Sequence, residues 1–548
     1  MSIEIGKTRI GDVVDENSQK LAEEIALAYY EYDFRMSFSE FQDKCNQVAK
    51  GLMALGIQKG DHISMWANNV PEWVYTQFGS AKMGAVMVTV NTNFKAYELE
   101  YLLKQSDSNT LILVGGVRTP DEYIQVVNEV CPELKDCEPG QLNSEKLPYL
   151  KNVIYIGEEK IPGMYNWNDI LEMGKSVSDA ELQSRQESLD PDDVIMMQYT
   201  SGTTGYPKGV MLTHTNLVGN GYHMAEVMGL SNEDTLCIPV PFFHCFGCVI
   251  GTMCCVTSGA AMAPITSFDP QTVLKAIDKY KCTAVHGVPT MFIAMLEELD
   301  KNNYDTSQLR TGVMAGSTCP VEVMKGVIEK MGATEMTIVY GQTEASPGIT
   351  QTRRDDAFDV KTETVGKALP GAEVKVVDPA TNEALGPDQP GELCSRGYHI
   401  MKGYYKMEDK TQEAIDSEGW LHTGDLATVD KDGNYTIVGR LKDMIIRGGE
   451  NIYPREIEEF LYTHPKIKDV QVVGVPSEKY GEEVAAFIQL RTEEDVSEDE
   501  IKEYCQDKIS FHKIPKYCFF VEEFPSTASG KIQKYKLREQ ATHELGLK

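Results

Sequence analysis

Apolar positions along the first 441 residues alternate between helical and strand spacing. From 41 to 55 they recur every three or four residues, which predicts an amphipathic helix, with Ser37 and Glu40 as a capping box before it and Gly56 after it. Short apolar runs predict buried strands at 62–66, 86–90, 111–114, 194–199, 283–288 and 337–340. This alternation of strands and helices predicts an α/β fold with largely buried sheets.

The end of the chain has a different pattern. Strands are predicted at 435–439, 470–475, 484–490 and 517–521. Pro454 opens a helix with an apolar face, and Ser497 with Glu500 caps another. These elements predict a compact α+β unit. Because 548 residues are too many for one hydrophobic core, we expect two domains, 1–441 and 442–548.

The charge balance narrows the class of partner. The chain has 83 acidic and 52 basic residues, so its net charge of −31 repels phosphate backbones and we expect no nucleic acid partner.

The first residues contain no basic stretch followed by an apolar one, so we expect no secretory signal. Residues 235–268 carry no Asp, Glu, Lys or Arg, but prolines and glycines interrupt them, which predicts buried core and no transmembrane segment.

Thirteen cysteines are scattered through the chain, which indicates a reducing compartment, and we expect a cytoplasmic protein. Cys245 and Cys248 form a C-x-x-C pair. A zinc or redox role would require a second ligand pair or a thioredoxin-like setting, and Cys254 and Cys255 follow at the wrong spacing. We therefore expect these thiols to be buried apolar residues.

A loop rich in glycine and hydroxyl residues follows the predicted strand at 194–199. Its glycines let the backbone turn tightly and direct amide groups at an anion, its hydroxyls add donors, and a lysine adds positive charge. The residues are Thr200, Ser201, Gly202, Thr203, Thr204, Gly205 and Lys208. The loop does not fit the Walker A pattern. It predicts a cradle for a triphosphate, and a polar surface loop is the alternative.

Four further segments follow this loop along the chain. With it, the set reads YTSGTTGYPKGVMLTH (199–214), YGQTE (340–344), WLHTGD (420–425), GRLKD (439–443) and PSTASGK (525–531). In order and spacing, over nearly the whole chain, they resemble the signature of the adenylate-forming superfamily. That superfamily comprises acyl-CoA synthetases, peptide-synthetase adenylation domains and beetle luciferases. The resemblance is nearest to the medium- and long-chain fatty acyl-CoA synthetases.

The resemblance implies a large multi-sheet α/β domain followed by a small, mobile α+β domain. It implies an acid–CoA ligase for a carboxylic acid, which we expect to be a fatty acid. ATP and the acid form an acyl-adenylate and pyrophosphate, and coenzyme A then takes the acyl group and releases AMP. ATP, Mg²⁺ and coenzyme A are the expected cofactors.

The resemblance also gives roles to individual residues. It implies that Tyr340 packs on adenine, Thr343 meets the α-phosphate and Glu344 holds Mg²⁺. It implies that Asp425 accepts hydrogen bonds from the ribose hydroxyls, with Arg440 as its partner. Further nucleotide contacts are expected from Gly316, Gly341 and Gln342.

Lys531 matches the lysine that bridges the acid and the α-phosphate. A cation is needed there because the attack brings two anions together. Lys442, two residues after Arg440, resembles the pivot on which the small domain turns between the half-reactions. The pantetheine arm of CoA is expected along Arg447, Gly448, Gly449 and Glu450.

The acid pocket is expected from Phe243, His244, Gly247, Val288, Gly316 and Gly341. His244 resembles an aromatic gate beside the reacting carboxylate. No aspartate lies between Asp234 and Asp269, where amino-acid-activating relatives carry one, so an α-amino acid is disfavoured. The apolar lining suits a fatty or aryl acid.

Three other interpretations stay open. A ligase that loads a carrier protein would differ in competition between CoA and the carrier. A luciferase-like oxygenase would consume oxygen or emit light. A non-catalytic nucleotide-binding homologue would bind ATP without turnover. The sequence determines neither the chain length of the acid nor the oligomeric state, and a homodimer is compatible with it.

Overall fold

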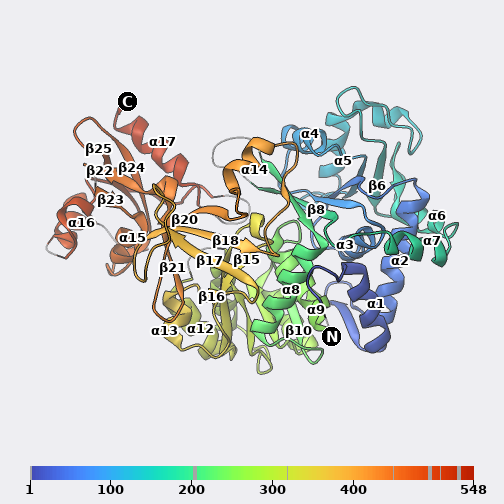
Figure 1. The fold of residues 1–548 in the computed structure, drawn as a ribbon, viewed down its shortest axis with the longest axis horizontal. Helices are drawn as coiled ribbons and strands as arrows, with labels where there is room; N and C mark the ends of the chain where they lie inside the picture. Colours follow the sequence, from blue (N-terminus) through green and yellow to red (C-terminus); the bar gives the residue numbers. More distant parts are fainter. Residues whose placement is uncertain are drawn as a thin grey trace. The chain divides into compact units, whose positions relative to one another are not determined.

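The computed structural model describes residues 3–200, 207–316, 319–448, 450–491, 496–506, 508–526 and 532–547, without the side chains of Glu450 and Asn451. The chain forms two compact units (Figure 1): Met1–Glu373 with Ser395–Leu421, and Val374–Cys394 with His422–Lys548. The predicted domain boundary between residues 441 and 442 stays a prediction.

Two large, mainly parallel sheets build the first unit. One has the strand order β19 (Gly403–Tyr404), β9 (Lys208–Thr213), β8 (Val194–Thr200), β4 (Val86–Thr89), β3 (His62–Trp66), β5 (Thr110–Val114), β6 (Asn152–Ile156) and β7 (Tyr165–Asn166). The other has the order β16 (Lys367–Ala368), β15 (Gly348–Gln351), β14 (Glu335–Gly341), β13 (Thr311–Met314), β12 (Ala284–Gly287), β10 (Thr235–Ile238), β11 (Ala261–Pro264), β1 (Ile25–Tyr29) and β2 (Phe34–Ser37). The six strands predicted in this part of the chain are confirmed.

Local signals explain why the helices of this unit form where they do. Helix α2 (Phe38–Ala54) starts with the predicted capping box, because Ser37 Oγ accepts from the Glu40 N–H at 3.3 Å and Glu40 accepts from the Ser37 N–H at 2.8 Å. Helix α3 (Pro71–Met83) starts at a proline, ends at Gly84 with φ +81°, and is buried almost all round. A helix buried on every side lies inside a core, here between layers of the first unit.

The uncharged segment 235–268 is mostly buried, as predicted, and its exposed residues are His244 and Ser267. It contains β10, a π-helix at Phe246–Gly251, α9 (Thr252–Ser258) and β11. Within the described residues, no helix has both the length and the apolar character needed to cross a membrane. All thirteen cysteines are free thiols. Cys245 is fully buried, and burial raises its pKa to about 12, which does not favour the thiolate that metal binding needs.

Four strands between residues 372 and 440 form a separate sheet, most of which belongs to the second unit. Its order is β17 (Ala372–Val377), β18 (Gly391–Gly397), β20 (Leu421–Val429) and β21 (Tyr435–Arg440). A second sheet of the same unit has the order β23 (Glu450–Ile452), β22 (Ile445–Arg447), β25 (Gly481–Leu490) and β24 (Ile467–Ser477), with β26 (Tyr517–Phe520) parallel to β25.

Alternating residues of β24 and β25 feed two separate cores. Val470 and Val472 face Ile457 and Leu461 of α15 (Pro454–Tyr462), together with α16 (Glu498–Cys505). Val473, Val475 and Phe487 pack instead with α17 (Lys534–Glu544). Because side chains of a strand alternate between faces, helices cover both faces of this sheet. The predicted α+β unit is confirmed, and so are its strands and the Ser497 cap.

Candidate functional site

The predicted phosphate loop joins two antiparallel strands. Strand β8 ends at Thr200 and β9 begins at Lys208, and these two residues are Cα partners, so the loop closes a hairpin. Ser201, Gly202, Thr203, Thr204 and Gly205 lie outside the described residues. Thr200 Oγ1 is buried and has no hydrogen-bond partner in the described part of the chain. A buried hydroxyl left over at the mouth of a hairpin suits an added acceptor such as a phosphate oxygen.

Lys208 is the cation at this hairpin. Burial is the main cause that lowers its pKa, and the carboxylate of Glu344 acts in the opposite direction. Its Nζ lies 3.9 Å from the ring centroid of Tyr404, a cation–π contact. Among the described side chains, Lys208 has no tight ion pair and is held by the Tyr404 ring. Its ammonium group can therefore move to a phosphate.

The YGQTE segment forms a tight turn after β14. A Cβ at Gly341 would lie 1.8 Å from the Pro347 carbonyl oxygen, so only glycine fits there. Thr343–Ala345 form a 3-10 turn, which places Thr343 Oγ1 3.8 Å from Cys245 Sγ. Tyr340, Gln342 and Thr343 are all partly exposed. The turn therefore lies beside the loop that contains His244.

Within the part of the chain that the structure describes, the carboxylate of Glu344 is anchored through one of its two oxygens. Its Oε1 accepts a hydrogen bond from the Tyr404 hydroxyl at 2.8 Å, and this bond uses one of the two carboxylate oxygens. One free oxygen beside ligand phosphates is the usual protein contribution to a Mg²⁺ site, so Glu344 fits the predicted ion. When bound, Mg²⁺ would neutralise charge on the phosphates.

Tyr404 was not among the residues predicted from sequence. It lies on the two-residue edge strand β19, is 5% exposed, and contacts both Glu344 and Lys208. Its position in the chain carries no local signal for a role at the site, because both partners are distant in sequence.

The expected acid-pocket residues lie at the ends of strands and in one loop. His244 is exposed, and its Nδ1 accepts from the Phe246 N–H at 3.2 Å. A Cβ at Gly247 would lie 2.3 Å from the Pro241 carbonyl oxygen, so this loop is compact, and Phe243 is half-buried in it.

Gly316 and Val288 are neighbours in this region. Gly316 has φ +94°, and a Cβ there would lie 3.0 Å from Val288 Cγ1. These residues follow β13 and β12, which are adjacent parallel strands. His286 lies in the core instead, because its Nε2–H donates to the Ile250 carbonyl and its Nδ1 accepts from the Val313 N–H. Burial lowers the pKa of His286 to about 4, so it is neutral.

In the second unit, Asp425 and Arg440 form a direct pair. They are Cα partners in the antiparallel strands β20 and β21, and Arg440 Nε lies 3.0 Å from Asp425 Oδ1. The Asp425 side chain is only 9% exposed. The predicted ribose carboxylate and its predicted partner are thus brought together by strand register.

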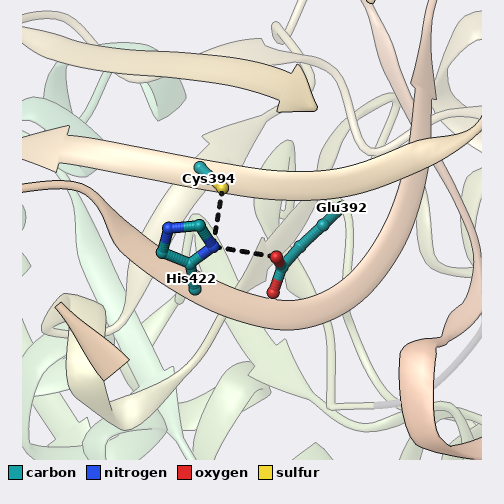
Figure 2. Close-up of side chains that lie close together, drawn as sticks. All are labelled: Glu392, Cys394 and His422. Carbon is teal, nitrogen blue, oxygen red and sulfur yellow. Dashed lines mark hydrogen bonds and ion pairs between the residues drawn. The ribbon is translucent and has the colours of Figure 1, made fainter. Parts of the chain in front are cut away.

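Hydrogen bonds clamp the turn that precedes Asp425 to β18. Glu392 Oε2 accepts from His422 Nδ1 at 2.8 Å (Figure 2), and Glu392 Oε1 accepts from the Gly424 N–H at 3.0 Å. Thr423 Oγ1 donates to the Leu393 carbonyl at 2.6 Å. Because a carboxylate only accepts, His422 carries its proton on Nδ1.

Cys394 completes this cluster, with its Sγ 3.5 Å from the same Nδ1 (Figure 2). Among the described residues, Glu392, Cys394 and His422 are the one group whose ligand atoms are close enough for a shared metal ion. Both carboxylate oxygens and the ring nitrogen already bond to one another or to the backbone. The arrangement therefore serves as a clamp on the Asp425 turn.

The segment expected to line the CoA arm is a short hairpin. Gly448 has φ +63° in the turn between β22 and β23, and its N–H donates to the Tyr480 carbonyl at 2.8 Å. Arg447 Nε bonds to Glu483 Oε2 at 2.6 Å, and its guanidinium lies 4.5 Å from the Tyr480 ring centroid. Gly449, the Glu450 side chain and Lys531 lie outside the described residues. Lys442 is exposed in the 3-10 turn Leu441–Asp443.

Comparisons with known proteins cover the whole chain. The family model described as AMP-binding enzyme matches residues 14–405, and that described as AMP-binding enzyme C-terminal domain matches 456–531. A protein of Bacillus subtilis (strain 168) named "Putative acyl-CoA synthetase YngI" is 56% identical over 544 residues, 99% of each chain. The human medium-chain acyl-CoA ligase ACSF2, mitochondrial, is 39% identical over 98% of this chain and 88% of its own length.

Solved structures share the same architecture. The anthranilate CoA ligase AuaEII in complex with anthranoyl-AMP has a TM-score of 0.85 at 27% identity, covering 100% of this chain and 99% of that one. A fatty acyl CoA synthetase of Mycobacterium tuberculosis has a TM-score of 0.75 at 28% identity, covering 98% and 99%. The predicted fold of a large α/β domain with a smaller α+β domain is confirmed.

Proposed function

Because the chain belongs to the family of AMP-binding enzymes and is an AMP-forming acid–CoA ligase that uses ATP, Mg²⁺ and CoA, we propose that its acid is a medium-chain fatty acid. We also propose that the residues described above carry out the two half-reactions. The relatives named medium-chain ligases and the apolar residues at the ends of β12 and β13 support this substrate class. The alternatives of an oxygenase and of a non-catalytic homologue are not supported by these relatives.

In the proposed first half-reaction, the acid carboxylate attacks the α-phosphate of ATP and pyrophosphate leaves. Lys208 and Thr200 bind phosphate oxygens, and Glu344 would hold Mg²⁺, which would neutralise charge on the phosphates. The resemblance assigns to Lys531 the bridge between the two reacting anions, where a positive charge would stabilise the transition state. The observation that supports this assignment is that Lys208 and Glu344, a cation and a carboxylate, both contact the side chain of one buried tyrosine, Tyr404.

In the proposed second half-reaction, the CoA thiol attacks the acyl carbon of the adenylate and AMP leaves. Asp425 and Arg440 hold the ribose in both steps. The smaller domain turns about Lys442 between the steps, so that Gly448 and its neighbours guide the pantetheine arm. Because pyrophosphate leaves before CoA reacts, the kinetics are expected to be ping-pong.

We also propose that the enzyme works in the cytoplasm, which its thirteen free thiols support. A homodimer is proposed as its assembly, and light scattering behind a sizing column tests it. No nucleic acid partner is expected from a chain of net charge −31.

Product mass spectrometry tests the proposed function. The protein is mixed with ATP, Mg²⁺, CoA and a panel of fatty, aryl and amino acids of graded length. Acyl-CoA and AMP from medium-chain fatty acids alone would support the proposal. Acyl-CoA only from aryl or very long acids would contradict the substrate class, and acyl-adenylate without a CoA thioester would favour a carrier protein as acceptor.

A further inference from the structure

Tyr404 contacts two oppositely charged side chains through two different parts of its own side chain. Its hydroxyl donates to Glu344 Oε1 at 2.8 Å, and its ring face lies 3.9 Å from Lys208 Nζ. Tyr404 is buried, so neither contact is made through bulk water. Because a carboxylate oxygen accepts, the hydroxyl is the donor in this bond.

Strand register places the ring beside Lys208. In the β19–β9 ladder, Tyr404 is the Cα partner of Val210 and Gly403 that of Met211. Lys208 lies two residues before Val210, and residues two apart on a strand share a face. Tyr404 and Lys208 therefore emerge on the same face of neighbouring strands.

Backbone and side-chain bonds place the hydroxyl beside Glu344. The Met401 N–H donates to the Glu344 carbonyl at 2.9 Å, and Ser346 Oγ donates to the His399 carbonyl at 2.7 Å. These bonds fasten the turn after β14 to the segment that leads into β19. Two independent sets of contacts thus fix Tyr404 between the hairpin of Lys208 and the turn of Glu344.

The arrangement keeps a cation and a carboxylate close without an ion pair between them. Each charge acts on the other, since Glu344 opposes the lowering of the Lys208 pKa, yet no ion pair between the two is found among the described side chains. A direct pair in a partly buried site would be hard to break, and it would neutralise both groups before a nucleotide arrives. The face of an aromatic ring binds an ammonium group more weakly than a carboxylate would bind it.

We propose that Tyr404 is a positioning residue for the adenylation half-reaction. It holds Glu344 by one oxygen, which leaves the other for Mg²⁺, and it holds Lys208 by a contact that a phosphate can replace. This inference rests on the proposed roles of Lys208 and Glu344. Tyr404 itself touches neither substrate nor metal in the proposal.

Three variants separate its two contacts. Tyr404→Phe keeps the ring and removes the hydroxyl, and Tyr404→Leu removes both. Tyr405→Phe is the matched control, because the Tyr405 hydroxyl donates to Asp107 Oδ2 at 2.9 Å, outside the proposed site. Circular dichroism and thermal unfolding confirm that each variant is folded before it is used.

Two readouts besides turnover test the roles. Calorimetric titration gives the dissociation constant of ATP with and without Mg²⁺, and competitive acetylation with peptide mass spectrometry gives the reactivity of Lys208. We expect Tyr404→Phe to weaken ATP binding about tenfold with Mg²⁺ and little without it, and to leave Lys208 reactivity unchanged. We expect Tyr404→Leu also to lower Lys208 reactivity, because the freed ammonium pairs with Glu344 and gains a higher pKa.

The half-reactions supply the final discrimination. Both Tyr404 variants should slow adenylate formation and leave thioester formation from supplied acyl-AMP near the level of Tyr405→Phe. Equal slowing of both half-reactions, or binding and labelling that match Tyr405→Phe, would overturn the inference while leaving the proposed function intact. If Glu344→Gln does not alter Mg²⁺-dependent ATP binding, the proposed role of Glu344 and the inference on Tyr404 both fail.

Discussion

Replacing Glu392 by alanine is expected to weaken ATP binding through the turn that carries Asp425. The Glu392 carboxylate accepts two hydrogen bonds, from the Gly424 N–H at 3.0 Å and from His422 Nδ1 at 2.8 Å. Gly424 has φ +69° and precedes Asp425 directly. When Gly424 loses the acceptor of its N–H, we expect this turn to relax. The relaxed turn then holds Asp425, the carboxylate proposed to bind the ribose hydroxyls, less well.

The size of the effect follows from these two bonds. A hydrogen bond to a charged group contributes about 1.5–3 kcal/mol. The His422 side chain is 24% exposed, so in the variant water replaces part of its hydrogen bond to residue 392. The Glu392 side chain is only 10% exposed, so water compensates little for the rest. We therefore expect a loss of about 2–3 kcal/mol in the free energy of unfolding. If about half of this free energy is also lost from ATP binding through Asp425, the KM for ATP rises about tenfold.

Acid-dependent exchange of pyrophosphate into ATP measures the effect, with ATP and acid titrated separately. Glu392→Gln should retain most of the function, because its amide oxygen accepts from the Gly424 N–H and its amide N–H can donate to His422 Nδ1 when the ring moves its proton to Nε2. Glu373→Ala is the matched control, since Glu373 pairs with Arg396 at 2.9 Å but is 58% exposed. A folded Glu392→Ala protein with an unchanged KM for ATP would refute the reasoning.

Three further outcomes are expected. Lys531→Ala should abolish adenylate formation yet leave thioester formation from supplied acyl-AMP largely intact, and equal loss in both assays would contradict its assignment. Gly316→Ala should lower acid activation, because φ is +94° and the new Cβ would lie 3.0 Å from Val288 Cγ1. Adding Val288→Ala should restore part of this activity. No restoration in the double variant would argue against this contact. His286 has its pKa lowered from 6.5 to about 4 by burial, so the unfolded chain binds more protons between these values. Its contribution to stability is therefore complete above pH 6.5 and falls by about 3 kcal/mol as the pH drops to 4. Urea unfolding at pH 7 and pH 4.5 measures this fall, which should be smaller in His286→Asn.

Much of the fold could be predicted because its signals are local. The capping box at Ser37 and Glu40 and the apolar strand 62–66 each depend on a few neighbouring residues, and the structure confirms both. The adenylate-forming segments were recognised because each is a continuous run of residues.

Contacts between distant segments could not be predicted in this way. Tyr404 reaches Lys208 only because β19 pairs with β9, and its sequence neighbourhood gives no sign of that pairing. Glu392 meets His422 only because β18 lies beside β20. Single residues that support a site through strand pairing need the tertiary structure to be found. The roles predicted for the binding residues themselves await the measurements above.

The predicted phosphate hairpin and the residue Val288 of the predicted acid pocket belong to different sheets of the first unit. The phosphate hairpin belongs to the sheet of β8 and β9, whereas Val288 and Gly316 follow adjacent parallel strands of the other sheet. We therefore expect substitutions of Val288, which follows β12, to alter the choice of acid while the proposed phosphate hairpin keeps its sequence. We expect such a separation to make the scaffold evolvable, because new side chains can be tried at Val288 while β8 and β9 keep their sequence.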